Sequence, residues 1–508
     1  MGRKRKELPE LKGVEISGVA AEGKAMAKVK LKETDETPIV IFIPYGAPGD
    51  IVDIKIVKKK HNYAEARITK MVKPSPMRVV PICKSFGVCG GCKWQHIPYE
   101  EQLRFKRRQV VDAMERIAKV EIPEVEPTLG SEKIWGYRNK MEYTFSNKRW
   151  KSWEEIRGEE PAGLSDNALG FHIPGSFDKV LHIDKCWLQE EIGDEIRNSC
   201  YSFAEKLDKE ATLIIQGINA FYDIKNNKGF LRTLMIRPTT TGELMVCVVF
   251  GDEVEETIKS SDKTLSPSAA DYFLKELSEK FPEITTLAWV INRKVNDSIA
   301  DQEVKIFKGP GFVEEKMGNL KFRISPKSFY QTNSRQAEAL YHTASEFAGL
   351  FKPNEDGKKP VVYDLYTGAG TIANYVAQNA EKVIGIEYVE DAVEDARINS
   401  QINGITNTEF FAGDMKDVLT ENFIESHGRP DIMIIDPPRA GMHEDVVDVI
   451  LKVKPPTIVY VSCNPATQAR DIALLDSSYK VTRIQPVDMF PHTHHVENVV
   501  KLEKRIES

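Results

Sequence analysis

Apolar and polar residues alternate over short distances in the first part of the chain, which is the pattern of β-strands. Within residues 8–75, five such runs are separated by turn residues, at 14–19, 25–31, 38–43, 50–58 and 63–71. Five short strands in so few residues predict a small OB-like β-barrel over residues 1–75, a fold that often binds single-stranded nucleic acid.

The pattern then changes, and residues 76–320 are predicted to form a second, mixed and mostly β domain. At its start, apolar residues recur at helical spacing and predict a helix over residues 99–120. The same helix carries four basic residues: Arg104, Lys106, Arg107 and Arg108. Residues 251–270 are rich in Ser, Asp and Glu, and we expect a loop or a helical excursion there.

From residue 321 onwards, strands and helices are predicted to alternate. Buried strands are expected at 361–366, 382–388, 409–412, 431–435 and 457–461, with helices at 371–377 and 391–401. Strands separated by helices predict a doubly wound parallel sheet, so residues 321–508 should form a Rossmann-like α/β catalytic domain. The last two strands, 481–487 and 496–502, have no helix between them and predict an antiparallel hairpin.

Composition agrees with several soluble domains. A chain of 508 residues is too long to form a single hydrophobic core. Its 41% hydrophobic and 29% charged residues are typical of a globular protein. No apolar run reaches the roughly 18 residues of a membrane span, and the basic N-terminus lacks the apolar stretch of a signal peptide. We therefore expect a cytoplasmic protein with neither a membrane nor an obligate protein as its partner.

The net charge of −6 conceals a basic N-terminal region. Residues 1–80 contain seventeen Lys or Arg against ten Asp or Glu, a local net charge of +7. Such a region on an otherwise acidic protein suits a polyanion such as a nucleic acid. Surface lysines that only aid solubility would give the same count.

The seven cysteines follow two patterns. Cys83, Cys89 and Cys92 lie within ten residues, whereas Cys463 stands alone, directly after the strand expected at 457–461. An odd number of cysteines, three of them clustered, argues against a disulfide framework and for metal binding or catalysis. Cys463 by itself would be explained by a buried core residue, but Asn464-Pro465 ends the strand abruptly and favours a rigid, exposed turn.

A glycine turn predicts a nucleoside site. Gly368-Ala-Gly370 follows the strand at 361–366 and opens a helix, so the backbone can approach a ligand closely. Glu387 ends the next strand, where an acid accepts hydrogen bonds from ribose hydroxyls, and Asp414 ends the one after, where it can face an adenine amino group. Ala373 replaces the third glycine of the dinucleotide fingerprint, so S-adenosylmethionine (SAM), which has no pyrophosphate, is favoured over NAD.

Three further segments follow successive strands of the same sheet, at Asp436, at Cys463 and at residues 491–497. Ligands of open α/β sheets bind outside the carboxyl ends of the strands. A cysteine and an acid beside a methyl donor predict covalent activation of a weak nucleophile such as C5 of uracil, by addition of the thiolate to C6. Taken alone, Glu497 would be a solvated or paired carboxylate. The histidines of the last segment lack thiolate or acidic partners at metal-ligand spacing: His492, His494 and His495.

Six motifs in order make the chain resemble the RNA (uracil-5)-methyltransferases over nearly its whole length. They are Cys83-x5-Cys89-Gly-Gly-Cys92, Ser328-Phe-Tyr-Gln331-Thr-Asn333, Asp364-Leu-Tyr-Thr-Gly-Ala-Gly370, Asp436-Pro-Pro-Arg-Ala-Gly441, Ser462-Cys-Asn-Pro465 and Pro491-His-Thr-x-His-x-Glu497. The resemblance implies a class I SAM-dependent methyltransferase fold, an N-terminal TRAM domain that binds RNA, Cys463 as the nucleophile and Glu497 as the general base. It also implies a set of SAM-binding residues: Gln331, Tyr366, Glu387 and Asp436, with Thr371 and Asp414 beside them.

By the same resemblance, the three clustered cysteines imply a [4Fe–4S] cluster, which requires four thiolates. Cys186 lies where the fourth ligand is expected, and its competitors are Cys200, predicted on a helix, and Cys247, predicted in a strand core. Zinc held by four cysteines is the alternative, although the five-residue gap after Cys83 exceeds the usual spacing. The cluster is expected to organise the RNA-binding middle domain.

The implied substrate is a uridine of 23S rRNA, because relatives acting on tRNA generally lack both the barrel and the cluster. A uridine of tRNA is the second candidate, and cytosine-5 methylation of RNA, which normally places its cysteine elsewhere, is the third. A non-enzyme alternative is an RNA-binding redox sensor or folding factor, which would not need Cys463. The chain departs from the family at Tyr366-Thr367, which replaces Phe-Cys, and in the stretch 251–270, which resembles an insertion.

Overall fold

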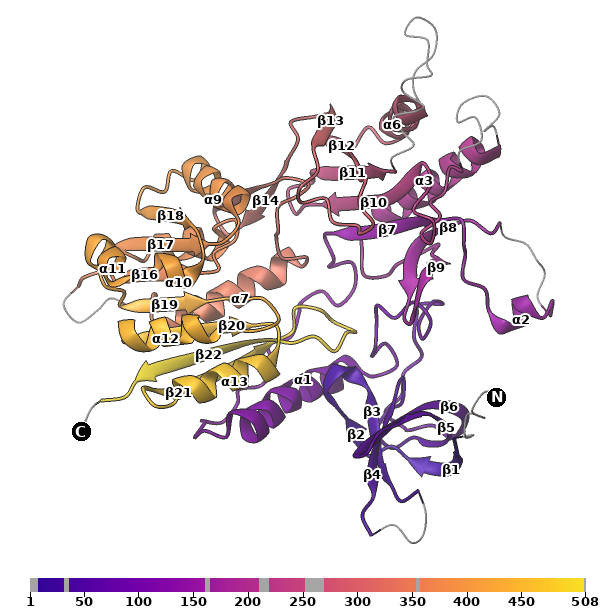
Figure 1. Ribbon diagram of the computed structural model, residues 1–508, viewed down its shortest axis with the longest axis horizontal. Helices are drawn as coiled ribbons and strands as arrows, with labels where there is room; N and C mark the ends of the chain where they lie inside the picture. The colour runs from indigo at the N-terminus through magenta and orange to yellow at the C-terminus, as the bar shows by residue number, and fades with distance from the viewer. Residues whose placement is uncertain are drawn as a thin grey trace, which may run out of the picture. The chain divides into compact units, whose positions relative to one another are not determined.

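The computed structural model describes residues 8–31, 36–159, 165–209, 219–251, 269–352 and 357–506. The helices and strands are labelled in Figure 1, and their residues belong to two compact units whose segments alternate along the sequence. The first unit contains Met1–Glu132, Pro437–His443 and Tyr460–Ser508, and the second contains Lys133–Asp436 and Glu444–Val459. Most of the polar stretch expected to be a loop or an insertion, residues 252–268, lies outside the described residues.

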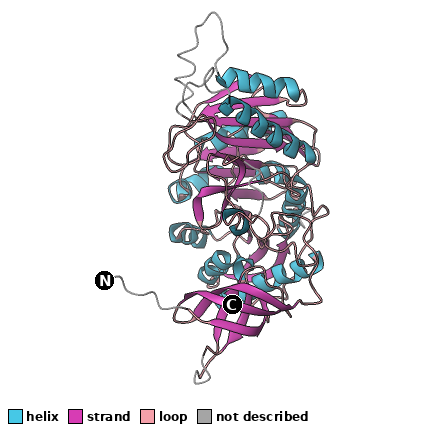
Figure 2. Cartoon of the chain, turned by 90° about the vertical axis from the view of Figure 1, so that its right-hand side faces the viewer, coloured by secondary structure: helices cyan, strands magenta, loops and turns pink. Residues whose placement is uncertain are grey.

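Six strands of the first unit form the N-terminal barrel, in the order β1-β5-β6-β4-β3-β2. They are β1 (Glu10–Glu15), β2 (Gly18–Val19), β3 (Ala25–Val29), β4 (Ile39–Ile43), β5 (Ile51–Lys59) and β6 (Tyr63–Lys73). Alternate residues are buried in β5, because successive side chains of a strand point to opposite faces. The predicted OB-like barrel is confirmed, and its crossing strands are visible at the lower end of Figure 2. The strand predicted at 14–19 is divided between β1, which pairs with β5, and β2, which pairs with β3.

The helix that follows the barrel buries polar as well as apolar side chains. Helix α1 (Tyr99–Ala113) continues into a π-helical turn, η2 (Met114–Ala118). The predicted helix is therefore present. Its buried face carries Val110 and Ala113 but also Gln102 and Lys106. The sequence groups Lys106 with three arginines, but Lys106 is buried, whereas Arg104 and Arg108 are exposed and Arg107 is half-buried.

A seven-stranded sheet forms the central part of the second unit, in the order β13-β12-β11-β10-β7-β8-β9. Its strands are β7 (Met141–Ser146), β8 (Ala168–Ile173), β9 (Ser176–His182), β10 (Leu231–Pro238), β11 (Leu244–Phe250), β12 (Thr286–Ile291) and β13 (Val304–Lys308). Neighbouring strands are antiparallel except β11 and β12. Helices α3 (Glu191–Lys209) and α6 (Ala269–Lys280) share one apolar core with the sheet. The mixed, mostly β character predicted for this part is confirmed.

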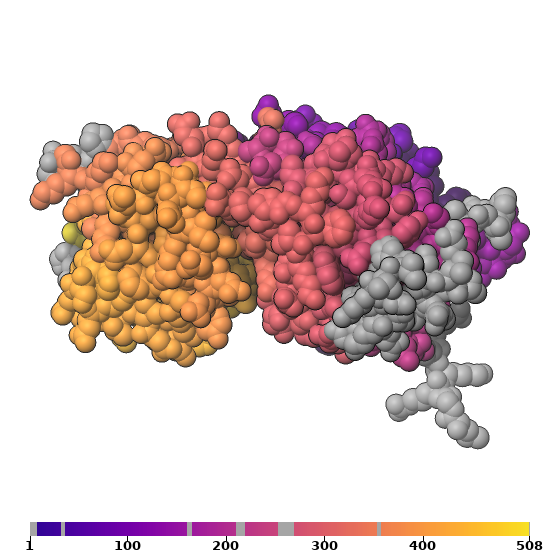
Figure 3. Space-filling view, turned by 90° about the horizontal axis from the view of Figure 1, so that it is seen from above, coloured from indigo at the N-terminus to yellow at the C-terminus, as the bar shows by residue number. Residues whose placement is uncertain are grey.

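The α/β part of the second unit begins after the hairpin of β14 (Val313–Met317) and β15 (Leu320–Ile324) and helix α7 (Ser334–Phe347). Four parallel strands follow in the order β18-β17-β16-β19. They are β16 (Val361–Leu365), β17 (Lys382–Glu387), β18 (Thr408–Ala412) and β19 (Ile432–Ile435). The helices between and after them are α8 (Thr371–Ala377), α9 (Glu390–Ile402), α10 (Met415–Val418), α11 (Glu421–His427) and α12 (Glu444–Val453). This is the predicted Rossmann-like alternation, and Figure 3 shows its side chains in orange.

The last strands lie largely in the first unit. β20 (Thr457–Ser462) begins in the second unit and ends in the first, and α13 (Pro465–Leu475) follows it. β21 (Tyr479–Val487) and β22 (Glu497–Lys504) then pair antiparallel, which confirms the predicted hairpin. No helix in the described part of the chain is long and apolar enough to cross a membrane.

Candidate active site

Strand β16 ends in a strained turn. Tyr366 has a φ of +64°, a left-handed conformation that costs a non-glycine residue on the order of 1 kcal/mol. The backbone N–H groups of Tyr366 and Thr367 both donate to the carbonyl of Ile386 on β17, at 3.0 and 3.1 Å. Gly370 has a φ of +73°, and a Cβ there would lie 2.8 Å from the Cβ of Ala396, so only glycine fits. The turn predicted from the sequence is therefore present at the carboxyl end of β16.

Glu387, at the end of β17, holds this turn through its carboxylate. Oε2 accepts the backbone N–H of Gly368 at 3.1 Å, and Oε1 accepts that of Val389 at 3.0 Å. The side chain is half-buried, and each oxygen has a further lone pair for another donor. The carboxylate is therefore fixed beside the glycine turn with capacity for a ligand hydroxyl.

Asp364 on β16 is a buried carboxyl that the sequence did not single out as a site residue. Its Oδ2 accepts the hydroxyl of Thr367 at 2.5 Å and the backbone N–H of Ala373 at 3.0 Å. Burial raises the pKa of Asp364 to about 7, and the negative charges of Asp436 and Glu387 act in the same direction. The sequence feature that could have identified Asp364 is its place as an acid inside an otherwise apolar strand.

Three carboxyl groups thus stand on neighbouring parallel strands. Asp436 directly follows β19, and desolvation raises its pKa to about 7. Glu387 ends β17, and the strand of Asp364 lies between these two. A nearby positive charge favours the ionised form of a carboxyl group. This edge of the sheet therefore suits a positively charged ligand.

The motif that contains Gln331 and the glycine turn are both attached to helix α9. The hydroxyl of Ser328 donates to Asp395 of α9 at 2.6 Å. The side-chain amide of Asn399, also on α9, donates to the carbonyl of Ala369 in the turn at 3.1 Å. Gln331 itself is half-buried. One helix thus holds two of the predicted cofactor segments.

The remaining two predicted cofactor residues occupy helix starts. Thr371 is the first residue of α8 and is buried. Asp414 is the N-cap of α10, where its Oδ1 accepts the backbone N–H of Lys416 at 3.2 Å. Part of the hydrogen-bonding capacity of Asp414 is therefore already used by the helix.

Cys463 stands in a braced turn of the first unit, directly after β20, and is half-buried. The next residue, Asn464, is the N-cap of α13, and its Oδ1 accepts the backbone N–H of Ala466 at 3.1 Å. The Nδ2 of Asn464 donates to the carbonyl of Arg439 at 3.0 Å. The structure therefore favours the rigid turn over the core position for this thiol.

Glu497 begins β22 and is buried, with 4% of its surface exposed. Its negative charge acts on Lys106 of α1 and raises the pKa of that lysine, which burial lowers overall. Lys106 also forms an ion pair with Asp488, at the start of the loop that leads to Glu497. A cation from a distant part of the sequence therefore accompanies the predicted base.

The three clustered cysteines lie in one loop of the first unit, and each is half-buried. Burial raises the pKa of Cys89, the charge of Cys83 adds to this, and a hydrogen bond from the backbone of Gly91 opposes it. Burial also raises the pKa of Tyr45, and the charges of Cys89 and Cys92 contribute. Within the described residues, however, no group of three or more His, Cys, Asp or Glu side chains could hold a metal ion.

Cys186 and its two competitors differ in their surroundings. Cys186 is half-buried in the second unit, where its backbone N–H donates to Asp194 at 3.0 Å, and Arg197 donates to the same oxygen at 2.5 Å. Cys200 on α3 and Cys247 in β11 are fully buried, and burial raises the pKa of both, that of Cys247 to about 12. Metal ligation requires the thiolate, so the two buried cysteines are the poorer ligand candidates.

Comparison with known proteins identifies the family. Residues 10–69 match the TRAM domain, and residues 302–505 match the tRNA (Uracil-5-)-methyltransferase model. An uncharacterized RNA methyltransferase of Bacteroides thetaiotaomicron is 54% identical over 490 residues, which cover 96% of this chain and 100% of that protein. The chain belongs to the RNA (uracil-5-)-methyltransferase family. An uncharacterized RNA methyltransferase of Porphyromonas gingivalis is 53% identical over 500 residues, covering 97% of this chain and 100% of the relative.

A solved structure resembles this RNA (uracil-5-)-methyltransferase family member along most of its length. It is that of the Pyrococcus abyssi tRNA (uracil-54, C5)-methyltransferase in complex with S-adenosyl-L-homocysteine, with a TM-score of 0.69 and 29% identity. The match covers 97% of this chain and 100% of that one, which confirms the class I methyltransferase fold. The eight predicted cofactor and reacting residues lie within residues 302–505, whereas the four predicted cluster cysteines lie outside both matched segments.

Proposed function

We propose that the protein transfers a methyl group from SAM to C5 of a uridine in RNA, with Cys463 as the nucleophile and Glu497 as the general base. The observation that carries this proposal is the position of Cys463. All seven cysteines lie in described parts of the chain, and Cys463 is the one that directly follows a strand. A partly exposed thiol in a rigid turn has the access that a nucleophile needs. Membership of the family supports the same reaction.

Six residues would hold SAM: Gln331, Tyr366, Thr371, Glu387, Asp414 and Asp436. Bound SAM would supply an electrophilic methyl group on a positively charged sulfur. The donor set fits such a ligand, because the carboxyl groups of Asp364, Glu387 and Asp436 favour a cation. Glu387 would accept hydrogen bonds from the ribose hydroxyls while it continues to hold the N–H of Gly368.

The proposed mechanism overcomes the weak nucleophilicity of uracil C5. The thiolate of Cys463 forms a bond to C6, and the displaced electron pair makes C5 a carbon nucleophile. After C5 has been methylated, the carboxylate of Glu497 removes the C5 proton. The electron pair of that C–H bond restores the C5–C6 double bond and expels the thiolate, and Glu497 then releases the proton to solvent.

The first proposed substrate is a uridine of 23S rRNA, and a uridine of tRNA is the second. The sequence favours rRNA, because relatives that act on tRNA generally lack both the barrel and the cluster. The Pyrococcus abyssi enzyme, named for uracil 54 of tRNA, weakens the part of this argument that concerns the barrel, because its structure matches 97% of this chain. The TRAM domain and the basic residues 1–80 suit either RNA. Basic residues bind the phosphates that rRNA and tRNA share, and OB-like barrels bind single strands, which both RNAs contain.

A [4Fe–4S] cluster held by Cys83, Cys89, Cys92 and Cys186 is part of the proposal. Four thiolates are the ligand set of such clusters. The charge of Cys83, which acts on Cys89, and the backbone hydrogen bond from Gly91 to Cys89 support it, because hydrogen bonds to sulfur tune cluster thiolates. The cluster would stabilise the RNA-binding part of the chain.

Mapping of 5-methyluridine in rRNA and tRNA, from cells with and without this protein, tests the proposed function. We expect one or more 5-methyluridines to disappear from 23S rRNA and to be restored by the unaltered protein but not by Cys463→Ala. Disappearance confined to tRNA would replace the first substrate by the second. If no modified uridine disappears, the methyltransferase proposal fails and an RNA-binding redox sensor is favoured.

A further inference from the structure

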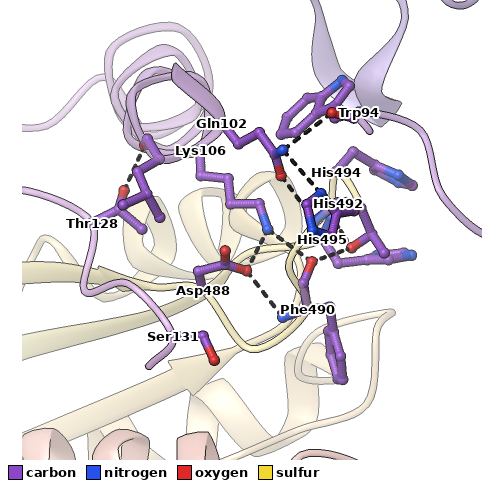
Figure 4. A network of polar contacts seen from close by, with 12 residues as sticks. Trp94, Gln102, Lys106, Thr128, Ser131, Asp488, Phe490, His492, His494 and His495 are labelled. Carbon is purple, nitrogen blue, oxygen red and sulfur yellow. Dashed lines mark hydrogen bonds and ion pairs between the residues drawn. The ribbon is translucent and has the colours of Figure 1, made fainter. Parts of the chain in front are cut away.

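Helix α1 turns two polar side chains, Gln102 and Lys106, toward the loop at residues 488–496 that leads to Glu497 (Figure 4). Both side chains are completely buried. They lie four positions apart and therefore share one face of the helix. Buried polar groups persist where they are bonded, so their partners show what this face of α1 holds.

Lys106 holds the turn that follows β21. Its ammonium forms an ion pair with Asp488 in which neither side chain is exposed, and it donates to the carbonyl of Phe490 at 3.1 Å. Asp488 also accepts the backbone N–H of Phe490 at 3.0 Å, and its own N–H donates to the carbonyl of Leu129 at 2.8 Å. Removing one partner of a buried ion pair is strongly destabilising, because it leaves the other charge uncompensated. The pair therefore fixes this turn against α1.

Gln102 holds the next part of the loop in a strained conformation. His492 has a φ of +64°, and its backbone N–H donates to Oε1 of Gln102 at 2.8 Å. The Nε2 of Gln102 lies 3.2 Å from Nδ1 of His492 and donates to the carbonyls of Trp94 and Ile97 at 3.1 and 2.8 Å. The carbonyl of His492 accepts the N–H groups of Lys93 and Trp94 at 2.8 and 3.0 Å. The strained His492 is thus held through its N–H by Gln102 and through its carbonyl by the backbone of Lys93 and Trp94.

The loop so held runs directly into Glu497. The negative charges of Asp488 and Glu497 both raise the pKa of Lys106, against a larger lowering by burial, and the ion pair itself is formed with Asp488. The residue that braces the loop through Asp488 and Phe490 is thus also within electrostatic reach of the proposed base.

We propose that Lys106, paired with Asp488, and Gln102 are positioning residues, and that by holding the loop at residues 488–496 they fix Glu497 for removal of the C5 proton. The inference rests on the proposed function, because it takes Glu497 as the base. It implies a selective defect when the pair is lost. Bond formation between Cys463 and C6, and methylation of C5, precede proton removal and should be spared, whereas release of the methylated RNA should be slowed.

The test uses a variant that removes both charges, Lys106→Met/Asp488→Asn, since Asn still accepts the N–H of Phe490. The matched control is Arg104→Met, which removes an exposed charge from the same helix. Each protein is given an rRNA or tRNA transcript that the unaltered protein methylates, prepared either with uridine or with 5-fluorouridine. Fluorine at C5 cannot leave as a cation, so adduct formation with the second RNA needs the thiolate but not the base.

With uridine RNA, the pair variant should release product at least about tenfold more slowly and accumulate a covalent protein–RNA adduct on denaturing gels. With 5-fluorouridine RNA, it should form the adduct at the rate of the unaltered protein, and Arg104→Met should match the unaltered protein with both. Equal slowing of the reactions with both RNAs would mean that the pair only stabilises the fold. Unchanged rates with both would mean that the position of Glu497 does not depend on the pair. Either result would overturn the inference.

If the Lys106→Met/Asp488→Asn protein does not fold, a second variant tests the inference. Gln102→Met removes the clamp on His492 without removing a charge, and we expect the same selective slowing from it; a folded Gln102→Met protein without that slowing would overturn the inference. Failure of the unaltered protein to form any adduct with 5-fluorouridine RNA would instead overturn the proposed function itself, and the role of Lys106 with it.

Discussion

The indole N–H of Trp94 donates to the backbone carbonyl of Gly23 at 3.0 Å, although the two residues are 71 positions apart. Gly23 ends a short turn of the barrel, η1 (Ala21–Gly23), with a φ of +74°. A Cβ on Gly23 would lie 2.7 Å from the Cβ of His494, whose loop leads to Glu497. The TRAM barrel, the segment after the clustered cysteines and the loop before the proposed base therefore meet around one glycine.

Gly23→Ala should weaken this junction. The new methyl group would be strained by the positive φ and would overlap His494, so we expect the free energy of unfolding to fall by about 2–4 kcal/mol in urea denaturation. Gly13→Ala is the matched control, because Gly13 has a φ of +64° but nothing lies within 4 Å of its Cβ position. The control should lose only about 1 kcal/mol. Equal losses in both variants would contradict a tight contact at Gly23.

The raised pKa of Asp364 gives the free energy of unfolding a defined pH dependence. The folded-state value of about 7 lies above the unfolded value of about 3.9, so the unfolded chain releases its proton first as the pH rises. The contribution of Asp364 therefore lowers stability progressively between about pH 4 and pH 7, by at most about 4 kcal/mol.

Asp364→Asn should remove that contribution and raise the melting temperature at pH 7–8, while changing it little at pH 4. The amide oxygen can still accept from Thr367 and Ala373, which both bond the same carboxyl oxygen. Calorimetry from pH 4 to pH 8 measures the difference. Parallel pH curves for the variant and the unaltered protein would show that Asp364 titrates in its ordinary range.

The same Asp364→Asn variant should bind SAM more weakly, because one of three carboxyl groups that favour a cation is lost.

Local elements could be predicted from the sequence. Helix α8 begins and ends at the predicted residues, Thr371 and Ala377, because a glycine turn precedes it and its apolar residues follow one period. The strand predicted at 361–366 ends one residue early, since Tyr366 takes a positive φ to enter the turn. Such a departure is a property of the turn that the spacing of apolar residues does not reveal.

Contacts between distant segments could not be predicted. In the sequence, Lys106 belongs to the same basic group as its arginine neighbours, and its partners Asp488 and Phe490 follow 382 and 384 positions later. Asp364 belongs to a recognisable glycine motif, but its burial depends on the strands β17 and β19 on either side of it. Both residues owe their character to partners that no local pattern contains.

Cys463→Ala should abolish methyl transfer and leave RNA binding unchanged, because the thiol acts on the uracil ring. We expect kcat/KM to fall by at least about three orders of magnitude in an assay with labelled methyl groups, with the Kd for RNA measured separately.

Glu497→Gln should methylate C5 and then stop, so that a covalent protein–RNA band persists on denaturing gels. Near-normal turnover by Cys463→Ala, or a missing band with Glu497→Gln, would contradict the respective role.

The proposed cluster ligands make Cys186 distinguishable from the two buried cysteines. Cys186→Ser should lose the brown absorbance, iron and acid-labile sulfide of anaerobically purified protein, because three thiolates leave one iron without its ligand. Cys247→Ala is the matched control: its thiol is fully buried in β11, so the substitution should cost about 1–2 kcal/mol of stability but no iron. An unchanged spectrum and iron content in Cys186→Ser would return the fourth ligand to Cys200 or Cys247. Zinc in place of iron in the unaltered protein would replace the cluster by a four-cysteine zinc site.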